Sequence, residues 1–141
     1  MRYPSKQQYL LSKLWLFVLL NMIFRDLHQL GKASFIEEIL SGVVNGVKIT
    51  DELMLFGGVL AEIPIALALF SNYLPPKTNK WTNIAASTIT ALVLLSGLPS
   101  ADLDDIFFLA IEVTSLISIM VVAWKLPIGP RPNRQVRSSA T

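Results

Sequence analysis

Residues 52–73 read ELMLFGGVLAEIPIALALFSNY. A helix rises about 1.5 Å per residue, so a run of roughly twenty apolar residues matches the ~30 Å hydrocarbon core of a bilayer. Glu62 lies about ten residues from either end of this run, which would put its carboxylate near the membrane midplane. A charge at that depth costs about 2.5 to 3.5 kcal/mol. We therefore expect Glu62 to be buried among other helices and either paired or protonated.

The composition of the whole chain agrees with a membrane protein. Of its 141 residues, 52% are hydrophobic and 16% are charged, whereas about 25% of residues are charged in ordinary soluble domains. The length predicts a single domain, most of which must be membrane spans. Cysteine is absent from the sequence, which excludes disulfides, thiolate metal sites and cysteine nucleophiles.

The first span is expected at residues 12–30. Its apolar run is similar to that of a signal peptide, but charged residues follow where small cleavage-site residues belong, so we expect an uncleaved span. Asn21, Arg25 and His28 recur at i, i+4 and i+7 and share one helix face, which is expected to point into the protein. Arg25 and His28 are also close enough to the end of the span to snorkel to the outer interface, and this alternative stays open.

The connection at residues 32–51 is predicted to carry local structure. Ser34 and Glu37 have capping-box spacing, which indicates a short helix at about residues 35–41. Asn45-Gly46 between β-branched residues is typical of a tight β-hairpin, because both central turn positions favour positive φ. A two-stranded hairpin alone is marginally stable, so we expect it to rest on the outer mouth of the helices.

Three further spans are expected at residues 53–73, 81–98 and 104–125, each bounded by polar or Pro-containing segments. Residues 74–80 are read as a tight loop before Trp81, and Thr50 is expected to cap the second span. Ser87 lies on the small-residue face of the third span, which favours close helix packing. Residues 1–125 therefore form the predicted four-helix transmembrane domain. Residues 126–141 are rich in proline and basic residues and are expected to form a disordered cytoplasmic tail.

The distribution of basic residues predicts the orientation of the chain in the membrane. In membrane proteins, the short loops on the cytoplasmic side of the membrane carry an excess of Lys and Arg. Nine of the twelve basic residues fall on one predicted side: Arg2, Lys6, Lys13, Lys77, Lys80, Lys125, Arg131, Arg134 and Arg137. Both termini are therefore expected in the cytoplasm, with the protein integral to the cytoplasmic membrane. Most of the acidic residues lie on the opposite side, where helix capping and solubility account for them.

A polar core is the main candidate site. Glu62, Glu112 and Arg25 are placed about 15, 12 and 8 Å inward from the outer ends of their helices. Asn21, Ser87 and His28 complete the set of polar residues that we expect near them. The simpler alternative is a buried salt bridge that only fixes the register of the helices. The convergence of polar groups from all four helices would instead form a ligand or proton site.

No other motif predicts a specific chemistry. His28 is the only histidine, so a metal site of the usual His/Cys spacing is not expected. No glycine-rich nucleotide motif occurs, and Gly57-Gly58 inside a span favours close helix packing. Glu62 and Glu112 are conceivable as a general acid and base, but that pair has no specificity as a sequence signal. The sequence gives no indication of a cofactor.

Several segments carry a resemblance to a known group of proteins. They are SKLWLFVLLNMIFRDLHQL, VVNGVKIT, ELMLFGGVLAEIPIAL and LPSADLDDIFFLAIE. Together they resemble an uncharacterised family of small bacterial four-span membrane proteins and, more loosely, the DoxX-type four-helix bundles. The resemblance implies an all-α fold, a four-transmembrane-helix bundle with a short outer helix and a hairpin between spans 1 and 2. It implies no activity.

Two classes of function follow from these observations. The first is a non-catalytic accessory or scaffold subunit of a larger membrane complex, with self-association as a variant. The second is a small carrier or a lipid- or quinone-binding bundle that uses Arg25 and the two intramembrane glutamates. Membrane lipid is the expected surrounding in both, and nucleic acid is not an expected partner. An enzyme is a weaker third alternative.

Overall fold

The computed structural model describes residues 4–127, and within them the fold is all-α apart from one short strand pair. Four of the five α-helices in this part of the chain are long, and the fifth, α2, is short. The elements are α1 (Lys6–Gln29), α2 (Ala33–Ser41), β1 (Val43–Val44), β2 (Val47–Lys48), α3 (Asp51–Phe70), α4 (Pro76–Ser96), the 3-10 turn η1 (Leu98–Ser100) and α5 (Leu103–Trp124).

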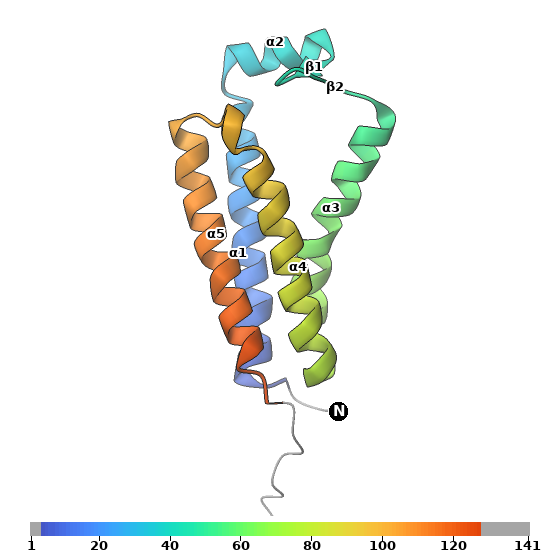
Figure 1. Cartoon of the computed structure of the whole chain (residues 1–141), viewed down its shortest axis with the longest axis vertical. Coiled ribbons are helices and arrows are strands. Elements are labelled where there is room, and N and C mark those ends of the chain that lie inside the picture. The colour runs from blue at the N-terminus through green and yellow to red at the C-terminus, as the bar shows by residue number, and fades with distance from the viewer. Residues whose placement is uncertain (1–3, 128–141) are drawn as a thin grey trace, which may run out of the picture.

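The four long helices lie side by side, and α2 with the strands crosses one end of them (Figure 1). Helix α5 packs against α1 and α4, and α1 also packs against α3. Contacts between α3 and α4 are sparse, and α3 diverges from its neighbours toward the α2 end. The start of α1 and the end of α5 both lie at the opposite end, which we call the terminal end.

The apolar core lies between α1, α4 and α5. Its fully buried side chains come mainly from one face of α1 and one face of α5, spaced three or four residues apart as a packed helix face requires. They include Leu11, Trp15 and Val18 of α1 and Leu116, Ile119 and Ala123 of α5. Helix α3 contributes Pro64 and Leu67 from its second half only.

Helix α1 begins at Lys6, so the predicted start of the first span at residue 12 is too late as a helix boundary. Ser5 and Gln8 form a capping box, in which the Gln8 amide donates to Ser5 Oγ at 3.2 Å and the Ser5 amide donates to Gln8 Oε1 at 2.9 Å. The Gln8 side chain also donates to the carbonyl of Leu74 at 2.8 Å. Hydropathy missed these two turns because they are polar and are stabilised by hydrogen bonds.

Helix α4 begins at Pro76, so most of the predicted loop at residues 74–80 is helical. Proline suits the first helical position because its fixed φ is helical and its missing N–H has no partner there. Lys80, expected in that loop, is buried. Its ammonium group donates to the Trp124 carbonyl at 3.2 Å and lies 3.9 Å from the Trp124 ring centroid. Tertiary contacts therefore extend this helix beyond its apolar run.

Helix α2 begins at Ala33 with Lys32 as its N-cap, and no side-chain cap is present. The predicted capping box is wrong, because Ser34 lies inside the first turn and does not precede it. Gly42 ends the helix with a φ of 75°, a left-handed conformation that glycine adopts without strain.

The strands that follow α2 are antiparallel, with Val43 opposite Lys48 and Val44 opposite Val47. Asn45 and Gly46 connect them at φ values of 50° and 77°, as a two-residue turn with two positive φ angles requires. The Asn45 amide donates to Glu38 Oε2 at 2.8 Å, which holds the turn against α2. Thr50 then caps α3 as expected, accepting from the Leu53 amide at 3.3 Å.

Two helices in the described part of the chain are long and apolar enough to cross a membrane, α3 and α5. Only 11% of the apolar window of α3 and 33% of that of α5 is buried within the structure, whereas the core helix of a soluble protein, which passes the same test of length and composition, is mostly buried. The sequence predicted four spans. Helices α1 and α4 carry more polar residues and do not pass this test.

Candidate functional site: a polar cavity near the Arg25–Glu112 pair

Arg25 of α1 forms an ion pair with Glu112 of α5. Arg25 Nη1 lies 2.8 Å from Glu112 Oε2, and the Glu112 side chain is 0% exposed while that of Arg25 is 18% exposed. Arg25 Nε also lies 3.8 Å from the exposed carboxylate of Asp26. The second oxygen of Glu112, Oε1, is buried and has no hydrogen-bond partner among the described residues. The pair thus joins two helices and leaves one buried acceptor available.

Glu62 is not part of this polar core, and its expected burial among the helices is wrong. It is exposed on α3, whereas Pro64 and Leu67 of the same helix are buried. At about 100° per residue, Glu62 lies ~200° around the helix from Pro64 and ~140° from Leu67. The face of α3 that carries Glu62 therefore points away from the rest of the chain.

Asn21 and His28 do not converge with Arg25 either. The Asn21 side chain donates to the Phe17 carbonyl of its own helix at 3.0 Å. His28 Nε2 lies 3.4 Å from Asp104 Oδ2, and its ring centroid lies 6.2 Å from that of Phe108. Both residues border a shallow apolar groove lined by Phe17, Leu20, Phe24 and Phe108. Their spacing puts the three residues on one helix face, but the expectation that this face points into the protein is wrong for His28, whose side chain is 58% exposed. The shared face therefore does not place the three side chains at one site.

Ser87 of α4 is fully buried, as its small-residue face predicted. Its hydroxyl oxygen has no hydrogen-bond partner among the described residues. Within residues 4–127, no hydrogen bond joins Ser87 to Arg25 or Glu112, and Ser87 does not line the cavity described below. Ser87 is therefore a buried polar residue of the helix packing.

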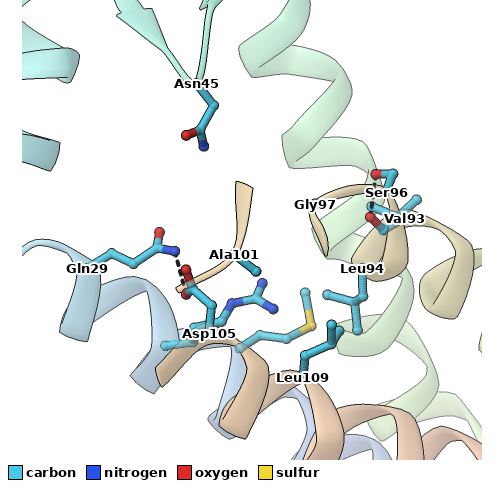
Figure 2. Close-up of a pocket in the computed structure, with 11 residues that line it drawn as sticks. Gln29, Asn45, Val93, Leu94, Ser96, Gly97, Ala101, Asp105 and Leu109 are labelled. Atoms are coloured by element: carbon cyan, nitrogen blue, oxygen red, sulfur yellow. Dashed lines mark hydrogen bonds between the residues drawn. The ribbon is translucent and has the colours of Figure 1, made fainter. Parts of the chain in front are cut away.

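A cavity of about 280 Å³ opens beside Arg25 at the α2 end (Figure 2). The helices α1, α4 and α5 supply most of its wall, and Asn45 of the strand turn faces it from above. Its polar lining residues are Arg25, Gln29, Asn45, Ser96 and Asp105, and its apolar lining residues include Met22, Val93, Leu94 and Leu109. The cavity can hold a small molecule with both polar and apolar parts.

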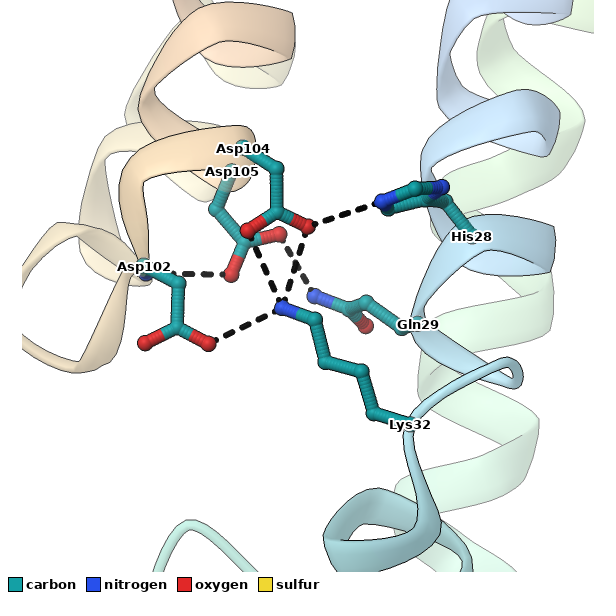
Figure 3. Close-up of polar contacts among 6 residues, drawn as sticks. All are labelled: His28, Gln29, Lys32, Asp102, Asp104 and Asp105. Carbon is teal, nitrogen blue, oxygen red and sulfur yellow. Dashed lines mark hydrogen bonds and ion pairs between the residues drawn. The ribbon is translucent and has the colours of Figure 1, made fainter.

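A network of hydrogen bonds and ion pairs borders the cavity and ties the end of α1 to the start of α5 (Figure 3). Lys32 Nζ donates to Asp102 Oδ2 at 2.9 Å and to Asp104 Oδ1 at 3.1 Å. Gln29 Nε2 donates to Asp105 Oδ1 at 2.8 Å. The hydrogen bonds that Lys32 donates to Asp102 and Asp104 raise the pKa of its ammonium group above its usual value. We call Gln29, Lys32, Asp102, Asp104 and Asp105 the α1–α5 clamp.

A family model matches residues 1–127, a range that includes all of the residues that the structure describes. The chain belongs to DUF6326, a family of unknown function. This confirms the expectation of an uncharacterised family. No curated protein and no solved structure matches the chain. The looser resemblance of this DUF6326 protein to DoxX-type bundles stays a prediction.

The DUF6326 chain also contains a buried polar network that the sequence did not reveal as such. Trp15 Nε1 donates to Asn83 Oδ1 at 2.6 Å, and Asn83 Nδ2 donates to the Asn79 carbonyl at 2.7 Å. Asn79 Nδ2 donates to the Ser71 carbonyl at 2.6 Å. The spacing of Asn79 and Asn83 by one turn was the available signal. The network joins α1, α3 and α4 near the terminal end.

The residues of the α1–α5 clamp were also missed as a unit. Capping explains only part of this acidic cluster: Asp102 is the N-cap of α5, and its amide donates to Asp105 Oδ2 at 3.3 Å. The charge of Lys32 in the sequence does not indicate which carboxylates it contacts. Within residues 4–127 of this DUF6326 protein, no cluster of three or more Asp, Glu, His or Cys side chains is placed to hold a metal ion.

Proposed function

We propose that the protein is a four-span integral membrane protein and a non-catalytic accessory or scaffold subunit of a larger membrane assembly. The observation that carries this proposal is the first half of α3. Residues 51–59 of that helix are all exposed, although the helix is one of the two that are long and apolar enough to span a membrane. No other part of residues 4–127 covers the surface of this half-helix.

Membrane insertion is supported by the character of the exposed surface. Leu55 is 70% exposed on α3, and Phe107 is 62% exposed on α5. A soluble monomer rarely exposes apolar side chains over whole helices, because each loses the free energy of burial. Helices of 20 and 22 residues span about 30 to 33 Å, the thickness of a hydrocarbon core.

Helices α1 and α4 complete the four proposed spans because they lie alongside α3 and α5. Each has more than 20 residues, and several of their polar side chains, including Gln8 and Lys80, are buried and hydrogen-bonded. Asn79 and Asn83 are fully buried in this way. Buried polar residues lower the mean hydropathy of these helices, although such residues would not contact lipid.

The proposed orientation places the terminal end in the cytoplasm of a bacterial cell. Within the described residues, the basic side chains of this end are Lys6, Lys13, Lys77, Lys80 and Lys125. Arg25, Lys32 and Lys48 lie toward the α2 end, where Lys32 is paired with two aspartates. This asymmetry matches the retention of Lys/Arg on the cytoplasmic side.

The test is extraction and purification of the tagged full chain from native membranes. Alkaline carbonate should leave the protein in the membrane pellet, and a mild detergent should release it in an assembly larger than one chain with its surrounding detergent. A protein that carbonate releases into the supernatant contradicts membrane insertion. A detergent-solubilised monomer contradicts the subunit role.

A second candidate function, a small carrier or a lipid- or quinone-binding protein, is favoured by the cavity beside Arg25. Arg25 lines this cavity. Its partner Glu112 has one buried oxygen, Oε1, without a hydrogen-bond partner among the described residues. Native mass spectrometry of the detergent-released protein tests this candidate. A retained small molecule that is lost in Arg25→Gln and kept in Lys13→Gln, a matched change on the same helix, would favour it over the subunit role.

A further inference from the structure

Three side chains that can accept hydrogen bonds line the cavity beside Arg25. They are Gln29 at the end of α1, Asn45 in the turn between the strands and Asp105 in the first turn of α5. Figure 2 shows Asn45 above Gln29 and Asp105. The same three residues also line a smaller polar cavity of about 80 Å³ next to α2. Because they border both cavities, they meet at the boundary between them, and we call them the three acceptors.

Each of the three acceptors has hydrogen-bonding capacity that the described chain does not use. The Gln29 side chain donates to Asp105 Oδ1 at 2.8 Å, and within residues 4–127 its own amide oxygen has no donor. Asn45 is hydrogen-bonded only through its backbone amide in this part of the chain. The two oxygens of Asp105 accept one bond each, from the amides of Gln29 and Asp102, whereas a carboxylate has about four acceptor sites.

The charge of Asp105 is not balanced by a cation in the described chain. Both of its hydrogen-bond donors are neutral amides. Lys32 binds Asp102 and Asp104 instead, and among residues 4–127 no basic side chain forms an ion pair with Asp105. A half-buried carboxylate with only neutral partners attracts a cation more strongly than a solvated one does.

Arg25 also lines the cavity, but carboxylates already balance its charge. Its Nη1 lies 2.8 Å from Glu112 Oε2, and its Nε lies 3.8 Å from Asp26 Oδ1. Asp26 and Asp105 both lie within electrostatic range of Glu112, so three carboxylates surround one guanidinium group. An anion would enter against this excess of negative charge, whereas a cation would reduce it.

The rest of the cavity wall is largely apolar. Met22 of α1, Leu94 of α4 and Leu109 of α5 contribute to it. A primary ammonium group carries one positive charge and three N–H donors. It therefore matches three oxygen acceptors, one of which is a carboxylate without a cation, while the apolar wall suits a hydrocarbon substituent.

We propose that the cavity beside Arg25 binds the protonated form of a small primary amine that carries an apolar substituent. The ammonium group donates to the three acceptors, and the substituent lies against the apolar wall. This inference rests on the second candidate function and gives it a ligand class. It does not depend on whether the chain is also a subunit of a larger assembly.

Four probes that share a benzene ring test the charge and the donors of the ligand. They are benzylammonium, benzyltrimethylammonium, benzyl alcohol and benzoate, each titrated at pH 7 into the purified full chain in mild detergent. The rise of the melting temperature with probe concentration gives the dissociation constant. Benzylammonium should bind at least roughly tenfold more tightly than benzyl alcohol or benzoate, because its hydrogen bonds are charge-assisted. Benzoate binding as tight as that of benzylammonium would overturn the proposal.

Benzyltrimethylammonium separates the hydrogen bonds from the charge alone. It keeps the positive charge but has no N–H donor, so it should bind several-fold more weakly than benzylammonium. Equal binding of the two cations would overturn the assignment of the three acceptors.

Asp105→Asn tests the carboxylate, because asparagine keeps an acceptor oxygen and removes the charge. It should weaken the binding of benzylammonium roughly tenfold. Asp51→Asn is the matched control, since Asp51 is an exposed carboxylate at the start of α3 and does not line the cavity. Equal effects of the two changes would overturn the role of Asp105.

Ala101→Phe fills the cavity from the segment before α5 without changing a charge. It should abolish the binding of benzylammonium, and it keeps the test decisive if Asp105→Asn does not fold. The variant also controls for partition of the probe into detergent. Binding of benzylammonium that is unchanged in Ala101→Phe would place the probe elsewhere and overturn the proposal.

The outcomes distinguish failure of the amine class from failure of the second candidate function. Preferred binding of benzoate or benzyl alcohol that Ala101→Phe abolishes would overturn the amine class and leave the cavity as a small-molecule site. Binding of none of the four probes would overturn the amine site. The molecule sought by native mass spectrometry then decides the second candidate function separately.

Discussion

At the scale of single residues, the Arg25–Glu112 pair is the feature on which the structure depends most. Glu112 is 0% exposed, so its charge is compensated mainly by one guanidinium group. Removal of one member of a buried ion pair leaves an unpaired charge, which costs more than removal of both members. The pair therefore gives a sharp test of how the helices are held together.

Arg25→Leu should lower the free energy of unfolding by about 3 to 5 kcal/mol. The double variant Arg25→Leu/Glu112→Leu should recover part of this loss, because neither charge is then left unpaired. Thermal unfolding in detergent measures both. Lys13→Leu, an exposed cation of the same helix, is the control and should change little. An unchanged melting temperature for Arg25→Leu would show that Arg25 is a snorkelling interface residue.

Trp15→Phe should destabilise the protein by about 1 to 3 kcal/mol, because Asn83 Oδ1 loses its 2.6 Å donor in a buried site. Ser71 Oγ, at 3.4 Å from the same oxygen, is too distant to replace it fully. Trp81→Phe, at a tryptophan that is 55% exposed, is the matched control. Equal effects of the two changes in thermal unfolding would show that the Trp15 hydrogen bond contributes no stability.

At the scale of elements, the sequence predicted which helices exist but not how each is turned or where two of them begin. Caps and apolar runs placed α3 and α5 within a few residues. Helices α1 and α4 began earlier than hydropathy indicated, since Gln8 bonds to Leu74 between α3 and α4, and Lys80 bonds to Trp124 of α5. Such partners are distant in sequence, so no local pattern reveals them.

The direction of Glu62 could not be predicted for a related reason. Helix α3 is apolar on all sides, so periodicity did not distinguish its packed face from its free face. The cost of a buried charge suggested the inside, whereas Pro64 and Leu67 occupy it. Arg25 and Glu112, by contrast, lie on α1 and α5, which pack against each other. Their meeting was among the pairings expected from depth alone.

Lys32→Met should loosen the α1–α5 clamp without unfolding the protein. Lys32 is solvated, so its ion pairs hold the helix ends locally. Hydrogen exchange should become faster at the amides of residues 102–105 and stay unchanged in the middle of α5. Because its pKa is raised, the contribution of Lys32 is fully present through the neutral range and is lost only as pH rises through that raised pKa. Unchanged exchange in Lys32→Met, or loss of protection in the natural protein already at neutral pH, would contradict the clamp.

At the scale of the whole molecule, the even number of long helices in the described chain brings both of its ends to one side. The connection between α1 and α3 and the connection between α4 and α5 then lie on the other side. This arrangement makes membrane topology testable with two positions, because each side of the structure offers an exposed residue outside the packed middle of the helices.

Single cysteines at Asn45 and Thr78 should label differently in intact cells. Both side chains are exposed, Asn45 at the α2 end and Thr78 near the terminal end. A membrane-impermeant thiol reagent added outside should modify Asn45→Cys and leave Thr78→Cys unmodified until the membrane is permeabilised. The reverse pattern would invert the proposed orientation, and labelling of both would contradict four spans.

The contact between Arg25 and Glu112 also sets a constraint on how the chain is made. The two residues are 87 positions apart, and a ribosome adds about 5 to 20 residues per second. Arg25 is therefore synthesised roughly 4 to 17 s before Glu112. In the proposed membrane-inserted protein, α1 keeps its guanidinium within reach of water or lipid phosphate during that interval, and the contact with Glu112 forms only when α5 arrives. Helix α5 thus completes the proposed insertion of α1.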